Sequence, residues 1–124
     1  MCDDKQVSLY KAEQFAVRVY KLYKYLKSKN EYDLAGQILR SGTSIGANIA
    51  ESKYAASAPD FINKMQISAK ECAETLFWLR FLKNTDCITQ AEFDSIYADG
   101  EELIKILTAS INTKKNNCRA TKSN

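Results

Sequence analysis

The sequence predicts an all-α protein, an antiparallel up-down four-helix bundle. Branched apolar residues recur with helical spacing at positions 34, 38, 45 and 49, and three other segments show the same kind of periodicity. One proline and four glycines among 124 residues leave few places for turns, which favours long helices. No alternation of apolar and polar residues is long enough to predict a strand.

The first helix is expected to run from Ser8 to Lys29. One broad face is apolar when successive residues are placed about 100° apart. It carries Ala12, Phe15, Ala16, Val19, Leu22, Tyr23 and Leu26. The opposite face is basic and carries Lys11, Arg18, Lys21 and Lys29, with Lys24 and Lys27 nearby. Glu13 is the only acid in this stretch of sequence.

The second helix is expected from Glu31 to Ala55, with Asn30 as its N-cap and Asp33 three residues later. Its apolar ridge is flanked by small residues. A glycine inside a helix costs about 1 kcal/mol relative to alanine, so the two glycines within residues 37–51, Gly42 and Gly46, indicate that another backbone lies close. We therefore expect this helix at the centre of the bundle, with a helix-packing motif made of Ser41, Gly42, Ser44, Gly46 and Asn48.

The third helix should be capped by Ser57, carry Pro59 in its first turn and end near Lys83. It has apolar residues on two sides. The core stripe is Phe61, Ile62, Met65, Ala69, Cys72, Ala73, Leu76 and Leu79, and the second set is Ile67, Phe77, Trp78 and Phe81. Soluble monomers rarely expose such a patch. We expect the second set to join copies of the chain in a homo-oligomer; coverage by a loop or by the basic first helix is the alternative.

The fourth helix is expected from Gln90 to Asn112, because Thr89 and Glu92 form a capping box. Its apolar face opposes an acidic one that includes Asp94, Asp99, Glu101 and Glu102. Residues 1–112 would then form one bundle domain. Residues 113–124 are polar and basic, and we expect them to be a disordered tail.

The composition argues against an enzyme. The chain has no histidine, which is the commonest general base and metal ligand, and it has no glycine-rich phosphate loop. Its four cysteines form no C-x-x-C pair. We expect no catalytic residue, no cofactor and no metal. Arg40 with Glu51, or Asp99 with Glu102, would be the best catalytic candidates, but charged residues on helix surfaces ordinarily serve solubility.

Location is expected to be cytoplasmic. The first residues lack the basic and then apolar pattern of a signal peptide. No apolar run approaches the roughly 20 residues of a membrane span, so we expect no membrane partner. Cysteines without paired spacing fit a reducing compartment.

The basic face of the first helix predicts a surface for nucleic acid, because lysine and arginine bind phosphates and tyrosine can stack on bases. Our candidate residues are Lys11, Arg18, Lys21, Lys24, Lys29 and Tyr25. The net charge is only +3, and two alternatives stay open. The lysines could form an ordinary solvated face, or they could pack against an acidic fourth helix of another subunit. An adaptor that binds a partner protein through the third helix is a further alternative.

Residues 39–51, LRSGTSIGANIAE, resemble the signature of a bacterial four-helix bundle family that includes proteins encoded within 23S rRNA intervening sequences. Residues 60–65, DFINKM, and the pattern from Glu71 to Leu79 resemble its third helix. The resemblance covers about residues 8–112. Many members have proline at the position of Gly46 and glycine at that of Ser52, so this chain keeps small residues there without the kink that proline would cause.

The resemblance implies a homopentamer arranged as a barrel, with no established enzyme activity. It also implies distant kinship with the accessory proteins of diversity-generating retroelements, which bind a reverse transcriptase and its RNA. The expected partners are therefore further copies of the chain, RNA or single-stranded DNA, and a reverse transcriptase. The family supplies no agreed catalytic or ligand residues.

Overall fold

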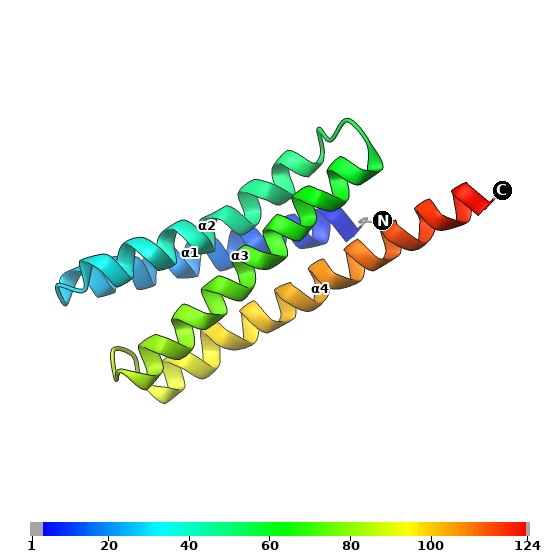
Figure 1. Ribbon diagram of the computed structural model, residues 1–124. Coiled ribbons are helices and arrows are strands. Elements are labelled where there is room, and N and C mark those ends of the chain that lie inside the picture. The colour runs from blue at the N-terminus through cyan, green and yellow to red at the C-terminus, as the bar shows by residue number, and fades with distance from the viewer. Residues whose placement is uncertain (1–3, 124) are drawn as a thin grey trace.

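Four antiparallel helices form the protein in a computed structural model, which describes residues 4–123 and the side chains of residues 7–119. The helices are α1 (Asp4–Ser28), α2 (Tyr32–Ser52), α3 (Ala58–Asn84) and α4 (Gln90–Ser123). Helices that follow one another in the chain pack together, and α1 meets α4 to close the bundle (Figure 1). The predicted all-α four-helix fold is confirmed.

The core is a single apolar layer between the four helices. Its largest fully buried side chains are Phe15, Val19, Leu26, Ile38, Ile45, Ile49, Met65, Leu79, Leu82, Leu103 and Leu107. Ala73, which we placed in the core stripe of α3, is exposed, and Thr75 and Ser68 are buried instead. Within the described residues, no helix is both long and apolar enough to cross a membrane.

Two helix starts follow the capping signals in the sequence. The backbone N–H of Asp60 donates to Ser57 Oγ at 3.2 Å at the start of α3. At the start of α4, the Thr89 N–H donates to the Glu92 carboxylate at 2.8 Å, and the Glu92 N–H donates to Thr89 Oγ1 at 3.1 Å. The hydrogen bond from the Thr89 backbone lowers the pKa of Glu92. Both predicted caps are confirmed.

The predicted cap at Asn30 is wrong. The N-cap residue of α2 is Glu31, which makes no side-chain capping bond. Asn30 instead ends α1 in the left-handed conformation, with φ of 65°. Its N–H donates to the Lys27 carbonyl at 3.0 Å, and the Glu31 N–H donates to the Leu26 carbonyl at 2.9 Å. This pair of bonds is a Schellman motif, in which an asparagine occupies the position that glycine usually takes.

Asp86 ends α3 in the same way, with φ of 60°. The Cys87 N–H donates to the Leu82 carbonyl at 2.8 Å, and the Asp86 N–H donates to the Lys83 carbonyl at 3.1 Å. The α1–α2 and α3–α4 connections are therefore tight turns closed by backbone hydrogen bonds, each with a short polar residue in the left-handed conformation. Both turns lie toward the same end of the bundle in Figure 1.

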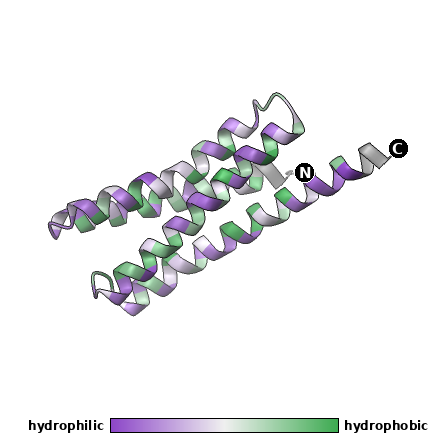
Figure 2. Cartoon of the chain, in the orientation of Figure 1, coloured by the Kyte–Doolittle hydropathy of each residue, from purple (hydrophilic) through white to green (hydrophobic). Residues whose placement is uncertain are grey.

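The segment after Asn112 differs from our expectation. We expected a disordered tail, but α4 continues as a helix to Ser123. Its last part projects beyond the other three helices (Figure 1), and it is largely hydrophilic in Figure 2. Ile111 is the last buried apolar side chain of α4. The Lys114 ammonium then lies 5.4 Å from the centre of the Phe61 ring on α3.

Replacing Asn30 by alanine should lower the free energy of unfolding by about 1–2 kcal/mol, because the left-handed conformation is costly for a residue with a β-carbon and no local polar group. Asn30→Gly should keep wild-type stability. Urea denaturation measures both. Asn63→Ala, at an exposed position inside α3, is the matched control and should cost nothing. An Asn30→Ala variant as stable as the wild type would rule out the left-handed turn.

Candidate functional site

The predicted packing motif on α2 brings α1 unusually close. A β-carbon built on Gly42 would lie 2.7 Å from Val19 Cγ1 and 2.9 Å from Val19 Cγ2, so only glycine fits there without movement. At Gly46 the same β-carbon would lie 3.5 Å from the Ala12 β-carbon, which is an ordinary contact. The two glycines therefore have different roles, and Gly42 sets the distance between α1 and α2.

The other side of α2 is tied to α3 by buried hydroxyl groups. The hydroxyls of Ser41 and Thr75 share a hydrogen bond of 2.8 Å, and the Ser68 hydroxyl donates to the Ile45 carbonyl at 2.8 Å. Ser41, Ser68 and Thr75 are all fully buried. Because a buried polar group without a partner is costly, these bonds fix the register of α3 against α2.

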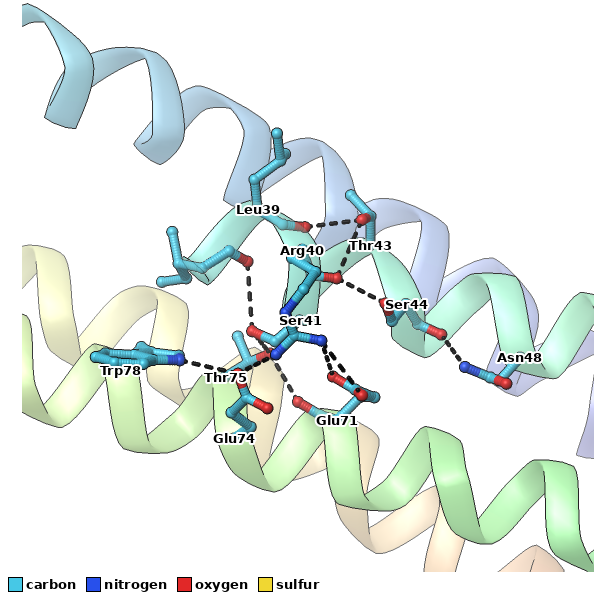
Figure 3. A network of polar contacts seen from close by, with 11 residues as sticks. Leu39, Arg40, Ser41, Thr43, Ser44, Asn48, Glu71, Glu74, Thr75 and Trp78 are labelled. Carbon is cyan, nitrogen blue, oxygen red and sulfur yellow. Dashed lines mark hydrogen bonds and ion pairs between the residues drawn. The ribbon is translucent and has the colours of Figure 1, made fainter. Parts of the chain in front are cut away.

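An ion-pair network extends this contact to the surface (Figure 3). The Arg40 guanidinium on α2 binds Glu71 at 3.2 Å and also binds Glu74. The Trp78 indole N–H donates to Glu74 Oε2 at 3.1 Å. Hydrogen bonds from Arg40 and then from Trp78 lower the pKa of Glu74, and the bond to Glu74 raises the pKa of Arg40. The network therefore orients Trp78.

The remaining polar residues of the motif bond within α2, and Glu51 beyond the motif bonds to α3. The Ser44 hydroxyl donates to the Arg40 carbonyl at 2.7 Å, and the Asn48 amide donates to the Ser44 carbonyl at 2.8 Å. Glu51 pairs with Lys64 at 3.0 Å. Arg40 and Glu51, our catalytic candidates on this helix, thus each make an ion pair that joins α2 to α3.

The second apolar set of α3 forms a surface cluster, which we call the α3 patch: Phe77, Trp78 and Phe81. Phe77 and Phe81 are 49% and 39% exposed. Ring centres lie 5.1 Å apart for Phe77 and Trp78 and 6.0 Å apart for Trp78 and Phe81, both edge-on. Ile67, the fourth residue of the predicted set, is half-buried. In the part of the chain that the structure describes, the backbones of α1 and α3 do not approach each other, so α1 does not cover the patch.

Two of the predicted nucleic-acid residues are engaged elsewhere. Lys11 pairs with Glu102 on α4 at 2.5 Å, and the hydrogen bond to Glu102 raises the pKa of Lys11. Arg18 pairs with Asp99 at 2.6 Å and donates to the Ser95 hydroxyl at 2.8 Å. The basic first helix and the acidic fourth helix thus meet within one chain. Asp99 and Glu102, the other catalytic candidates, are therefore both engaged in ion pairs that join α1 to α4.

The second half of α1 is different, and we call its surface the basic end of α1: Lys21, Lys24, Lys27 and Lys29 with Tyr20 and Tyr25. All four lysines are exposed, and none has an ion pair within the described residues. The Lys24 ammonium lies 5.9 Å from the centre of the Tyr20 ring, and the Lys29 ammonium lies 5.8 Å from that of Tyr25. Exposed cations therefore sit directly beside exposed aromatic rings.

A groove of about 550 Å³ runs beside this surface, between α1 and α4. We call it the α1–α4 groove, and its lining is Arg18, Lys21, Leu22, Tyr25, Ile88, Ala91, Glu92, Ser95 and Ile96. A second hollow of about 360 Å³ also borders Tyr25 and reaches Lys29 and the α3–α4 turn. Helical periodicity could not predict either one, because both depend on how far apart α1 and α4 lie.

Two further kinds of site concern metals and thiols. Among the side chains of residues 7–119, no three histidine, cysteine, aspartate or glutamate side chains gather in a way that could hold a metal ion. Cys72 is buried, which raises its pKa to about 12, and its thiol lies 3.5 Å from the Gly100 carbonyl oxygen. Cys87 and Cys118 are free and half-buried, and Cys2 lies outside the described residues.

The fold and these contacts define a class: small helical bundles whose second helix packs through glycine and serine. The chain belongs to the 23S rRNA-intervening sequence protein family, whose model matches residues 5–109. It is similar to a protein of unknown function from the S23 ribosomal protein family of Bacteroides thetaiotaomicron VPI-5482. That similarity covers 89% of this chain and 99% of the other, with 44% identity and a TM-score of 0.86. None of the proteins with curated descriptions matches the chain.

Gly42→Ala and Gly46→Ala form a matched pair, because each adds one methyl group to α2. Both should gain up to about 1 kcal/mol of helix propensity. At Gly42 the added carbon also meets Val19, and such overpacking costs about 1–3 kcal/mol. We expect Gly42→Ala to be less stable than Gly46→Ala by that amount in urea denaturation. Equal stabilities of the two variants would contradict the close approach at Gly42.

Proposed function

We propose that the protein is a non-enzymatic, homo-oligomeric scaffold, pentameric as the family resemblance implies, that binds RNA through the basic end of α1. The observation that carries this proposal is the contrast along α1. Lys11 and Arg18 are neutralised by α4, whereas Lys21, Lys24, Lys27 and Lys29 have no ion pair among the described residues.

Phosphate binding follows from the local charge. Residues 19–30 contain the four lysines of the basic end and no acid. Four positive charges therefore lie on one end of one helix, although the net charge of the chain is only +3. A protein that neutralises phosphates with such cations gains affinity from the release of counterions, and exposed tyrosines beside them can stack on unpaired bases.

The family description supports RNA over other polyanions, since it refers to an intervening sequence of 23S rRNA. Catalysis is not part of the proposal, because the charged groups that were candidates for it are engaged in joining helices. A cytoplasmic location is part of it. Free cysteines at positions 72, 87 and 118 fit a reducing compartment.

The α3 patch supports the homo-oligomer. Aromatic anchors with exposed faces are typical of subunit interfaces, and the Arg40–Glu74 contact holds Trp78 in place before any association. α1 and α3 occupy diagonal corners of the bundle, because their backbones do not approach each other within the described residues. Association through α3 would therefore leave the basic end of every copy accessible, and several copies on one RNA would bind with increased avidity.

An adaptor function is the second candidate, and the same exposed rings of Phe77 and Phe81 favour it. In that case the α3 patch would bind a different protein, such as the reverse transcriptase that the distant kinship implies. The two candidates differ in a simple property. A scaffold built from copies of this chain is an oligomer on its own, whereas an adaptor with a free patch is a monomer.

Replacing Lys21, Lys24 and Lys29 together by glutamine should weaken the binding of a single-stranded RNA by about tenfold or more and should reduce the salt slope of log K by about 2. Fluorescence anisotropy from about 50 to 200 mM salt measures both. Lys53, which directly follows α2, Lys70 on α3 and Lys105 on α4 are all exposed. Their replacement by glutamine gives a matched triple control with the same net charge. The proposal would be contradicted if the two triple variants lost RNA affinity equally. It would also be contradicted if the wild type bound single-stranded DNA more tightly than RNA, or bound no RNA.

Phe77→Glu should convert the oligomer to single chains, because it places a charge within the α3 patch. Light scattering measures the mass. Phe77 is preferable to Trp78, whose indole bonds Glu74. Tyr54→Glu is the control, since Tyr54 is an aromatic residue that is 88% exposed and lies away from the patch. A wild type that is already monomeric at micromolar concentration would exclude the homo-oligomer.

A further inference from the structure

We infer that the α1–α4 groove receives an unstacked base of single-stranded RNA, while the lysines of the basic end hold the flanking phosphates. This inference rests on the proposed RNA binding and adds to it a site with a defined ligand, one nucleobase. It rests on the lining of the groove, on the position of Tyr25 and on the spacing of Lys21 and Lys29.

The floor of the groove is apolar. Ile88 and Ile96 are each only 6% exposed, Leu22 is half-buried, and Ala91 leaves space above them. The volume of about 550 Å³ lies within the roughly 300–1,000 Å³ that is typical of small-ligand sites. A nucleobase has two apolar faces and a polar edge, so it can bury a face on this floor and leave its edge at the mouth.

The rim of the groove already has fixed polar groups. Arg18 is held at one end by Asp99 and Ser95. Glu92 is held on the α4 side by the Thr89 N–H. These groups are engaged with the protein, so the rim is arranged before a ligand arrives and does not need to be ordered by it.

Tyr25 and two lysines align along α1 in a way that suits a single strand. Lys21, Tyr25 and Lys29 are four residues apart, which places them on one stripe of the helix. The two lysines are separated by about 12 Å along the axis. The Tyr25 ring stands between the α1–α4 groove and the second hollow, and Lys29 lies over it at 5.8 Å. Phosphates can thus contact the lysines while a base between them turns inward against Tyr25.

The geometry excludes a paired base as the occupant. In an RNA duplex the base faces are stacked and the major groove is too deep and narrow for side chains to read, whereas single strands present splayed bases to aromatic residues. The groove should therefore favour a single strand over a duplex of the same length. The neighbouring hollow at Lys11 has only about 120 Å³, and its lysine is paired with Glu102, so it offers no comparable site.

Ala91→Phe tests the inference, because it fills the groove without changing any charge. We expect this variant to bind a single-stranded RNA oligonucleotide at least about fivefold more weakly, as losing one stacked base does, with the salt slope unchanged. Ala47→Phe, at an exposed position on α2, is the matched control and should bind like the wild type. Circular dichroism checks that both variants are folded.

Tyr25→Ala provides a second variant, since Tyr25 is 42% exposed and its loss removes stacking but little of the core. It should weaken binding by a similar factor. If Ala91→Phe and Tyr25→Ala both bind like the wild type while the triple lysine variant does not, base insertion is wrong and phosphate binding stands. If the wild type binds a duplex as tightly as a single strand, base insertion is also wrong. If the wild type binds no RNA, the proposed function itself fails.

Discussion

The rest of the structure depends on the contact between Gly42 of α2 and Val19 of α1. A β-carbon at residue 42 would lie 2.7 Å from the valine, so the two helices are as close as glycine allows. On its other side α2 is fixed to α3 by the buried Ser41–Thr75 bond. Because α2 is fixed on both sides, it positions its two neighbours, α1 and α3. Among the described residues, α4 packs only against these two helices, so its position depends on them. The closing contact between α1 and α4 is the smallest of the four helix pairs, and it is there that the groove opens.

Electrostatics divides α1 into two parts. In its first half, Lys11 and Arg18 are neutralised by Glu102 and Asp99, and these pairs hold α4 in place. In its second half, the lysines make no ion pair with α4 among the residues that the structure describes, and they stay exposed. Exposed ion pairs of this kind contribute little to stability individually. Their larger effect is that they occupy Lys11 and Arg18, so that the lysines in the second half of α1 are the cations available to bind phosphates.

Periodicity and capping residues predicted the fold class, because these features depend on local sequence. They also predicted the starts of α2, α3 and α4 and the end of α3 to within one residue. The role of Asn30 was misjudged, since an asparagine favours both a helix N-cap and a left-handed C-terminal turn. The helical extension of α4 was missed because residues 113–123 lack apolar spacing. Which lysines are paired, and the presence of the α1–α4 groove, could not be predicted, because they depend on side chains from helices about 80 residues apart in the chain.

A double-mutant cycle on Gly42→Ala and Val19→Ala tests the central contact most directly. Removing the valine methyl groups makes room for the new β-carbon, so Gly42→Ala should cost less in the Val19→Ala background than in the wild type. We expect a favourable coupling free energy of about 1 kcal/mol or more, within the range found for residues in contact. Additive effects of the two substitutions in urea denaturation would contradict the close contact between Gly42 and Val19 that sets the distance between α1 and α2.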